Sequence, residues 1–64
     1  MIIRTNVEAA SGRIRTVYYK HMGSNGKAVL CGKGDAANLD SETAEKALSH
    51  LKQIDHRFTQ AELV

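Results

Sequence analysis

The residues of this chain with the clearest chemistry are its arginines and lysines. Arg13 and Arg15 stand two positions apart, so in an extended strand both guanidinium groups lie on one face. A guanidinium group can donate two hydrogen bonds to the O6 and N7 atoms of guanine, and any Lys or Arg can neutralise a phosphate. This pattern indicates a polyanionic partner such as nucleic acid.

The charges of the chain are also sorted by position. Residues 1–34 carry six Lys and Arg against a single acidic residue, Glu8, for a net charge of +5. Residues 35–64 carry three cations against six carboxylates, for a net charge of −3. A basic half followed by an acidic half favours a strongly charged partner, although the overall charge of +2 is low for a protein that binds DNA on its own.

Three other groups of residues do not have the spacing that their chemistry requires. His50 and His56 are six residues apart and point in different directions on a helix, and no Cys-x-x-Cys or His-x-x-x-His pair offers a metal site. Cys31 with His21 lacks a third group to orient a nucleophile. The Gly-Lys-Gly run at 32–34 is too short for a phosphate-binding loop. We therefore expect no metal, no cofactor and no enzymatic activity.

The size of the chain limits its core. Sixty-four residues make one domain, which buries only about 60% of its unfolded surface. Domains of this size usually gain stability from a disulfide, a metal or a partner subunit. The single cysteine excludes an internal disulfide and fits a reducing compartment. No apolar run is long enough to span a membrane, and the N-terminus lacks the basic-then-apolar pattern of a secretion signal. We expect a cytoplasmic protein, without membrane contact, that forms a homodimer.

Three segments have the composition of β-strands, at residues 2–8, 13–22 and 27–31. β-Branched and aromatic residues are common in them. Gly12 supplies a positive φ for the first turn, and the Asn-Gly pair at 25–26 is a strong hairpin signal for the second. The order of these segments predicts two consecutive antiparallel hairpins.

A helix is predicted from about residue 41 to residue 56. Asp40 is a favourable N-cap, and the residues at 59–64 are expected to fray or to form a last short turn. The apolar side chains recur at helical spacing, at Ala44, Ala47, Leu48, Leu51, Ile54 and Phe58. The predicted fold class is therefore α+β, in which a three-stranded antiparallel sheet (β-β-β-α) packs against one C-terminal amphipathic helix.

One face of such a sheet is covered by the helix and the other is open. Alternation assigns to the covered face Ile3, Thr5, Val7, Ile14, Ala28 and Leu30. It assigns to the open face Arg4, Asn6, Arg13, Arg15, Lys27 and Val29. We therefore expect a positively charged platform on the open face. Tyr18, Tyr19 and Lys20 stay unassigned, because a bulge near Thr16 or a change in turn length shifts the register.

The order of several motifs resembles the N-terminal arm-binding domain of phage tyrosine integrases and the related plant ethylene-response DNA-binding domains. The motifs are the Tyr-Tyr-Lys strand at 18–20, the Gly-Lys turn at 26–27, the Leu-Cys-Gly-Lys strand end at 30–33 and the acidic-capped helix from Asp40. The resemblance spans residues 13–54, and the helix keeps the family's small-residue face but not its serine spacing. It implies a three-stranded sheet in the major groove, with contacts from Arg13, Arg15, Tyr19, Lys20 and Lys27.

The sequence thus predicts a small non-enzymatic protein that binds double-stranded DNA through the basic open face of its sheet. The predicted nucleic-acid-binding residues are Arg4, Arg13, Arg15, Tyr19, Lys20 and Lys27. The alternative is a protein-binding module or inhibitor of the phage or mobile-element type, which docks on a macromolecular partner through an exposed strand edge. A third interpretation is that these cations are solvated surface residues without a ligand.

Overall fold

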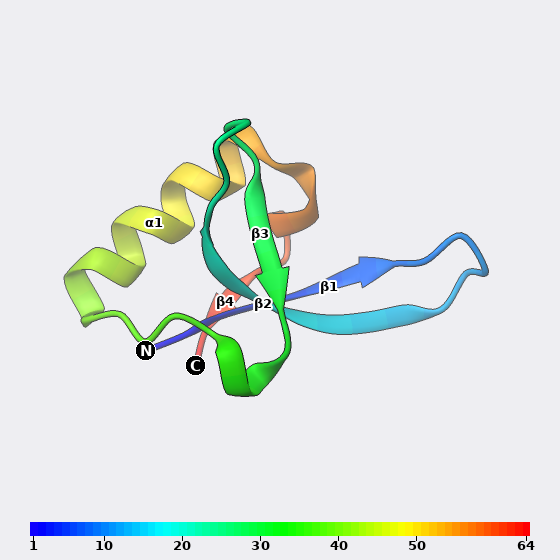
Figure 1. The fold of residues 1–64 in the computed structure, drawn as a ribbon, viewed down its shortest axis with the longest axis horizontal. Coiled ribbons are helices and arrows are strands. Elements are labelled where there is room, and N and C mark those ends of the chain that lie inside the picture. The colour runs from blue at the N-terminus through cyan, green and yellow to red at the C-terminus, as the bar shows by residue number, and fades with distance from the viewer.

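The computed structural model describes all 64 residues and contains one α-helix and one antiparallel sheet (Figure 1), which confirms the predicted α+β class. The strands are β1 (Ile3–Glu8), β2 (Ile14–Met22), β3 (Ala28–Cys31) and β4 (Glu62–Leu63), in the spatial order β3-β2-β1-β4. The helix α1 spans Ser41–Ile54, and two single 3₁₀ turns, η1 (Lys33–Asp35) and η2 (His56–Phe58), lie on either side of it. The helix is too short and too polar to cross a membrane.

The sheet has four strands, so the prediction of three was wrong. The C-terminal tail returns along β1, where Glu62 pairs with Arg4 and Leu63 with Ile3. The backbone of Val64 exchanges two hydrogen bonds of 2.9 Å with that of Ile2. The tail is held in place because Ala61 is buried in the core and Leu63 packs against it. As a result β1 lies inside the sheet. Its outer edge is covered at Ile3 and Arg4, so a docking strand could not pair with the whole length of β1.

Both hairpins turn through the same three-residue loop. In the first, the Ala9 N–H donates to the Arg13 carbonyl over 2.8 Å and Gly12 has φ 84°. In the second, the Gly23 N–H donates to the Lys27 carbonyl over 2.7 Å and Gly26 has φ 78°. A three-residue loop that ends in a left-handed residue requires glycine at that position. Both turns therefore form at the glycines that the sequence indicated, Gly12 and Gly26.

The strand register corrects part of the predicted faces. Ile3 and Thr5 are buried on the covered side, as expected, and Arg15 lies opposite Val7 on that same side. Ile14 lies opposite Glu8 on the open side and is 72% exposed. Arg13 follows the same alternation opposite Ala9, so it also lies on the covered side. The predictions for Arg13, Ile14 and Arg15 were wrong because the second strand enters the sheet with the opposite phase.

The irregularity in β2 lies further along the strand than expected. Tyr19 pairs with Leu30 and His21 with Val29, which leaves Lys20 as the extra residue of a bulge. The sequence suggested a bulge near Thr16 instead, but Thr16 pairs regularly with Asn6. The bulge lies between the part of β2 that pairs with β1 and the part that ends at the second turn, and β2 bends sharply there (Figure 1).

The core is small and lies between the sheet and the helix. Ile3, Leu51 and Phe58 are almost completely buried. Phe58 belongs to η2 and not to the helix, because α1 ends at Ile54, two residues before the predicted end. Asp55 explains this end, since its carboxylate accepts a hydrogen bond from the Arg57 N–H and starts η2.

The first hairpin extends beyond the rest of the molecule (Figure 1). We call residues 6–16 the arm. None of these residues is buried, because α1 lies at the other end of the molecule. The arm contributes to the longest dimension, 35 Å, against 23 and 21 Å for the other two. β4 pairs only with the first two residues of β1, and β3 pairs with β2 only from Tyr18 onwards, so both outer edges of the arm are unpaired.

Candidate nucleic-acid interface

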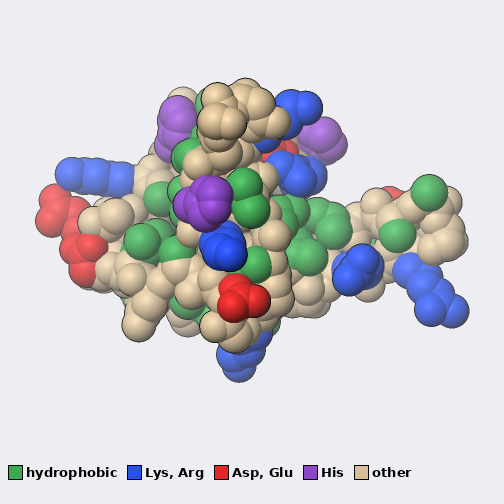
Figure 2. Space-filling view, in the orientation of Figure 1, with side chains coloured by type: hydrophobic (Ala, Val, Ile, Leu, Met, Phe, Trp, Pro, Cys, Tyr) green, Lys and Arg blue, Asp and Glu red, His purple; other side chains and the backbone are tan.

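Arg13 and Arg15 lie together on the arm. Arg15 is opposite Val7, and Arg13 follows the same alternation opposite Ala9, so both side chains lie on one side of the two-stranded ribbon. Both residues are exposed, and neither makes an ion pair. Figure 2 shows basic side chains along this projecting end of the molecule. The arm therefore presents two guanidinium groups without an ion-pair partner on one face, while its single carboxylate, Glu8, lies opposite Ile14 on the other face.

Arg4 lies on the open face, as predicted, but it is paired. Its guanidinium group donates a hydrogen bond to the Glu62 carboxylate of β4. This hydrogen bond and the charge of Glu62 raise the pKa of Arg4. Because no pattern in the sequence predicts β4, the partner of Arg4 was missed. Arg4 keeps its positive charge, but Glu62 compensates part of it, so Arg4 attracts a phosphate less than expected.

Tyr19 has a structural role in the fold. It is half-buried, packs against the core, and its ring meets that of Phe58 edge to face, with centroids 6.4 Å apart and an interplanar angle of 78°. Edge-to-face pairs of this kind stabilise cores. The ring is therefore already occupied within the protein, and stacking on a base would require it to leave this contact.

Lys20 and Lys27 are exposed and unpaired, but they lie away from the arm. Lys20 occupies the bulge of β2, and Lys27 follows the turn into β3. The Lys27 N–H donates to the Asn25 side chain over 3.0 Å, which fixes the turn and leaves the ammonium group free. The six predicted residues are therefore not gathered into one patch.

The open face does not form the basic platform that the sequence predicted. The residues of β1 and β2 on this face include the Arg4–Glu62 pair and the Thr16–Asn6 hydrogen bond of 3.0 Å. Further along, Tyr18 lies opposite the half-buried Cys31. This face is thus mixed and close to neutral, and the unpaired arginines lie instead on the arm.

One charged cluster was missed at the sequence level. Arg57 donates to both carboxylate oxygens of Asp55 and, over 3.2 Å, to the backbone carbonyl of Ala28. The side-chain hydrogen bond from Arg57 lowers the pKa of Asp55, and the same bond raises the pKa of Arg57. The Asp-x-Arg spacing at the end of the predicted helix was the available signal, since an Asp that caps a turn often holds the residue two positions on.

Comparison of the chain with protein-family models, with characterised proteins and with solved structures finds no match. Two paired strands lie about 4.8 Å apart, and a two-stranded ribbon fits into the major groove of B-DNA, which is about 12 Å wide. An arm with two free arginines on one side has the shape and charge for this contact.

Proposed function

We propose that the protein binds duplex DNA by inserting the arm into a groove, with Arg13 and Arg15 as the principal contacts. The observation that carries the proposal is the projecting ribbon, uncovered by any other element, with both guanidinium groups free of carboxylates. Phosphate contacts supply the affinity, and a guanidinium group that reaches a guanine edge supplies base preference. This differs from the sheet-face contact expected from the sequence, while two of its residues are the same.

The distribution of charge supports an approach with the arm first. The exposed acidic residues Asp40, Glu42 and Glu45 lie at the start of α1, at the end of the molecule opposite the arm (Figure 1, Figure 2). A DNA backbone near the arm is therefore separated from these carboxylates by more than the 8–10 Å over which salt screens charges at roughly physiological ionic strength. The basic first half and the acidic second half of the sequence thus place positive charge at the arm end of the long axis and negative charge at the end where α1 starts.

Fluorescence anisotropy with a labelled duplex tests the proposal, measured at several salt concentrations. Each phosphate contact contributes about 0.9 to the slope of log K against log salt concentration. The Arg13→Ala/Arg15→Ala variant should therefore lower the slope by roughly 2 and weaken binding at least tenfold at about 50 mM salt. Its matched control is Lys46→Ala/Lys52→Ala, which removes the same charge from the exposed side of α1.

The control variant should bind DNA almost as well as the unchanged protein. If both double variants lose affinity equally, the interaction is a nonspecific effect of net charge and the arm has no special part in it. No detectable binding by the unchanged protein at about 50 mM salt would reject a DNA function altogether.

The unpaired edges of the arm favour a second candidate function, the docking of a protein strand. Residues 6–8 and 14–16 pair only with one another, and an exposed strand edge is a template for a further strand. A second copy of the chain is the first partner to test. Light scattering at high protein concentration should then give twice the monomer mass of 7.0 kDa, and the monomer mass alone would exclude self-association by this route.

A further inference from the structure

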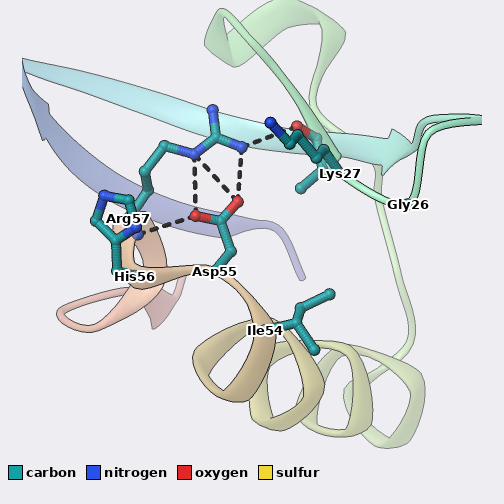
Figure 3. A pocket seen from close by; sticks show the side chains of 7 residues that line it. Gly26, Lys27, Ile54, Asp55, His56 and Arg57 are labelled. Atoms are coloured by element: carbon teal, nitrogen blue, oxygen red, sulfur yellow. Dashed lines mark hydrogen bonds and ion pairs between the residues drawn. The ribbon is translucent and has the colours of Figure 1, made fainter.

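A cavity of about 450 Å³ opens between the turn that joins β2 to β3 and the junction of α1 with η2 (Figure 3). Its walls include Gly26 and Lys27 from the turn, Ile54 from the end of the helix, and His56 and Arg57 from η2. Segments almost thirty residues apart in sequence therefore bring three nitrogen-bearing side chains to one hollow. None of them belongs to the arm.

Arg57 is held rigidly at this cavity. Its Nε donates to Asp55 Oδ1 over 3.0 Å, and its Nη2 donates to Asp55 Oδ2 over 2.6 Å and to the Ala28 carbonyl over 3.2 Å. Its Nη1 makes no hydrogen bond within the protein, and Figure 3 shows this nitrogen turned away from the carboxylate. A guanidinium group fixed in this way loses little rotamer entropy when it binds a ligand.

The charge around the cavity is positive. Asp55 is its only carboxylate, and both oxygens of Asp55 accept hydrogen bonds from Arg57. The ammonium group of Lys27 and the ring of His56 have no hydrogen-bond or ion-pair partner in the protein. Lys27 therefore adds a positive charge that no carboxylate compensates. Because Asp55 compensates only Arg57, the cavity can accept one further anion.

The edge of β3 adds a backbone donor to the same place. The Gly23 N–H bonds to the Lys27 carbonyl, and hydrogen-bonded pairs alternate along an antiparallel ladder. The next pair, Met22 with Ala28, is therefore a pair without ladder hydrogen bonds, and the N–H and C=O groups of Ala28 point away from β2. The Ala28 carbonyl accepts a hydrogen bond from Arg57, whereas the Ala28 N–H remains free to donate to a ligand.

We infer that this cavity binds a small oxyanion, of the phosphate class, between Arg57 and Lys27. The ligand accepts hydrogen bonds from Arg57 Nη1 and from the Lys27 ammonium group, with the Ala28 N–H as a further donor. A phosphate has the tetrahedral set of oxygens and the charge for such contacts. The inference does not depend on the arm, so it can hold whether or not the arm binds DNA.

Titration of the ¹⁵N-labelled protein with inorganic phosphate tests this inference, at constant ionic strength set with chloride. Saturable amide shifts are expected at residues 26–28 and 55–57, with no comparable shifts in the arm. Lys27→Ala should weaken phosphate binding about fivefold. Lys33→Ala, which removes an exposed and unpaired cation outside the cavity, should leave the affinity unchanged. Arg57→Lys keeps the charge but not the fixed fork, and should also weaken binding.

Three results would overturn the inference: shifts that do not saturate, shifts spread over all basic residues, or an equal loss of affinity in Lys27→Ala and Lys33→Ala. The Arg13→Ala/Arg15→Ala variant identifies the source of the phosphate and separates this site from the arm. It should bind inorganic phosphate normally, and a failure to do so would contradict an independent site. If a short DNA duplex changes the chemical shifts of the cavity amides in this variant, the ligand is a nucleic-acid phosphate. If only inorganic phosphate changes these shifts, the ligand is a free phosphate group.

Discussion

Arg57 forms hydrogen bonds to three parts of the molecule through its Nε, its Nη2, its backbone N–H and its backbone carbonyl. Its side chain contacts Asp55 at the end of α1 and the Ala28 carbonyl at the edge of β3. Its own carbonyl accepts a 2.6 Å hydrogen bond from the hydroxyl of Thr5 in β1, which satisfies the only buried polar residue. Only six apolar residues are buried, so these polar links add to the stability that a small apolar core provides.

Replacing Arg57 with Ala should lower the free energy of unfolding by about 1–3 kcal/mol. The change leaves the Asp55 carboxylate, whose side chain is only 11% exposed, without its charged partner, and it leaves the Ala28 carbonyl unpaired. Urea unfolding measures the effect, with Lys52→Ala on the exposed side of the helix as the control, expected within about 0.5 kcal/mol of the unchanged protein. An Arg57→Ala variant as stable as this control would show that the hydrogen bonds of Arg57 to Asp55 and Ala28 do not stabilise the η2 turn.

The Asp55–Arg57 pair also predicts how stability depends on pH. The pKa of Asp55 is lower in the folded protein than in the unfolded chain, so the unfolded chain takes up the proton more readily. The stabilising effect is complete above the unfolded pKa of about 3.9 and is lost as the pH falls below it. Melting temperatures between pH 6 and 2.5 should therefore drop less for Asp55→Asn than for the unchanged protein, and parallel curves would contradict this assignment.

At the scale of elements, alternation within β1 was predictable from the sequence and the phase of β2 was not. Ile3 and Thr5 are buried as expected, and the neighbouring positions in the strand are half-buried or exposed. Ile14 starts the opposite strand of the arm, where no helix covers either face, so an apolar side chain there is no evidence of burial. The bulge at Lys20 and the pairing of β4 likewise depend on contacts between distant segments, which residue types alone do not specify.

The contrast between Ile14 and Ile3 gives a test of the arm as a separate element. Ile3→Ala removes a fully buried side chain and should lower the free energy of unfolding by about 2–5 kcal/mol. Ile14→Ala, at a position that is 72% exposed, should change it by less than about 0.5 kcal/mol. Thermal or urea unfolding of both variants measures this difference. A large loss from Ile14→Ala would mean that the arm packs against a partner or against a second copy in solution.

The candidate site was predictable in its residue types but not in its arrangement. Arg13 and Arg15 stand out in the sequence and remain free in the structure, because nothing acidic lies within ion-pair distance of them. Arg4 and Tyr19 looked equally available, yet Arg4 is paired with Glu62 and Tyr19 packs on Phe58. Whether a charged or aromatic side chain is free depends on its neighbours in space, which for both residues come from the last seven residues of the chain.

At the scale of the whole molecule, the protein divides into a packed body and an unsupported ribbon. A two-stranded ribbon without a covering layer is only marginally stable in water, so the arm is expected to open locally far more often than the body. The acidic start of α1 and the basic arm lie at opposite ends of the 35 Å axis (Figure 2). An anionic partner on the face of the arm that carries Arg13 and Arg15 would therefore order the ribbon and avoid the carboxylates of α1, while Glu8 lies on the other face of the ribbon.

Hydrogen–deuterium exchange of the backbone amides, with and without a short DNA duplex, tests the central claim most directly. In the free protein the amides of residues 6–16 should exchange fastest among the strands, while those near Ile3 and Leu51 exchange slowly. Addition of duplex DNA at about 50 mM salt should slow exchange in the arm by at least tenfold and leave α1 unchanged. Protection of α1 or of the open face of the sheet, with an arm that exchanges as fast as before, would contradict the account.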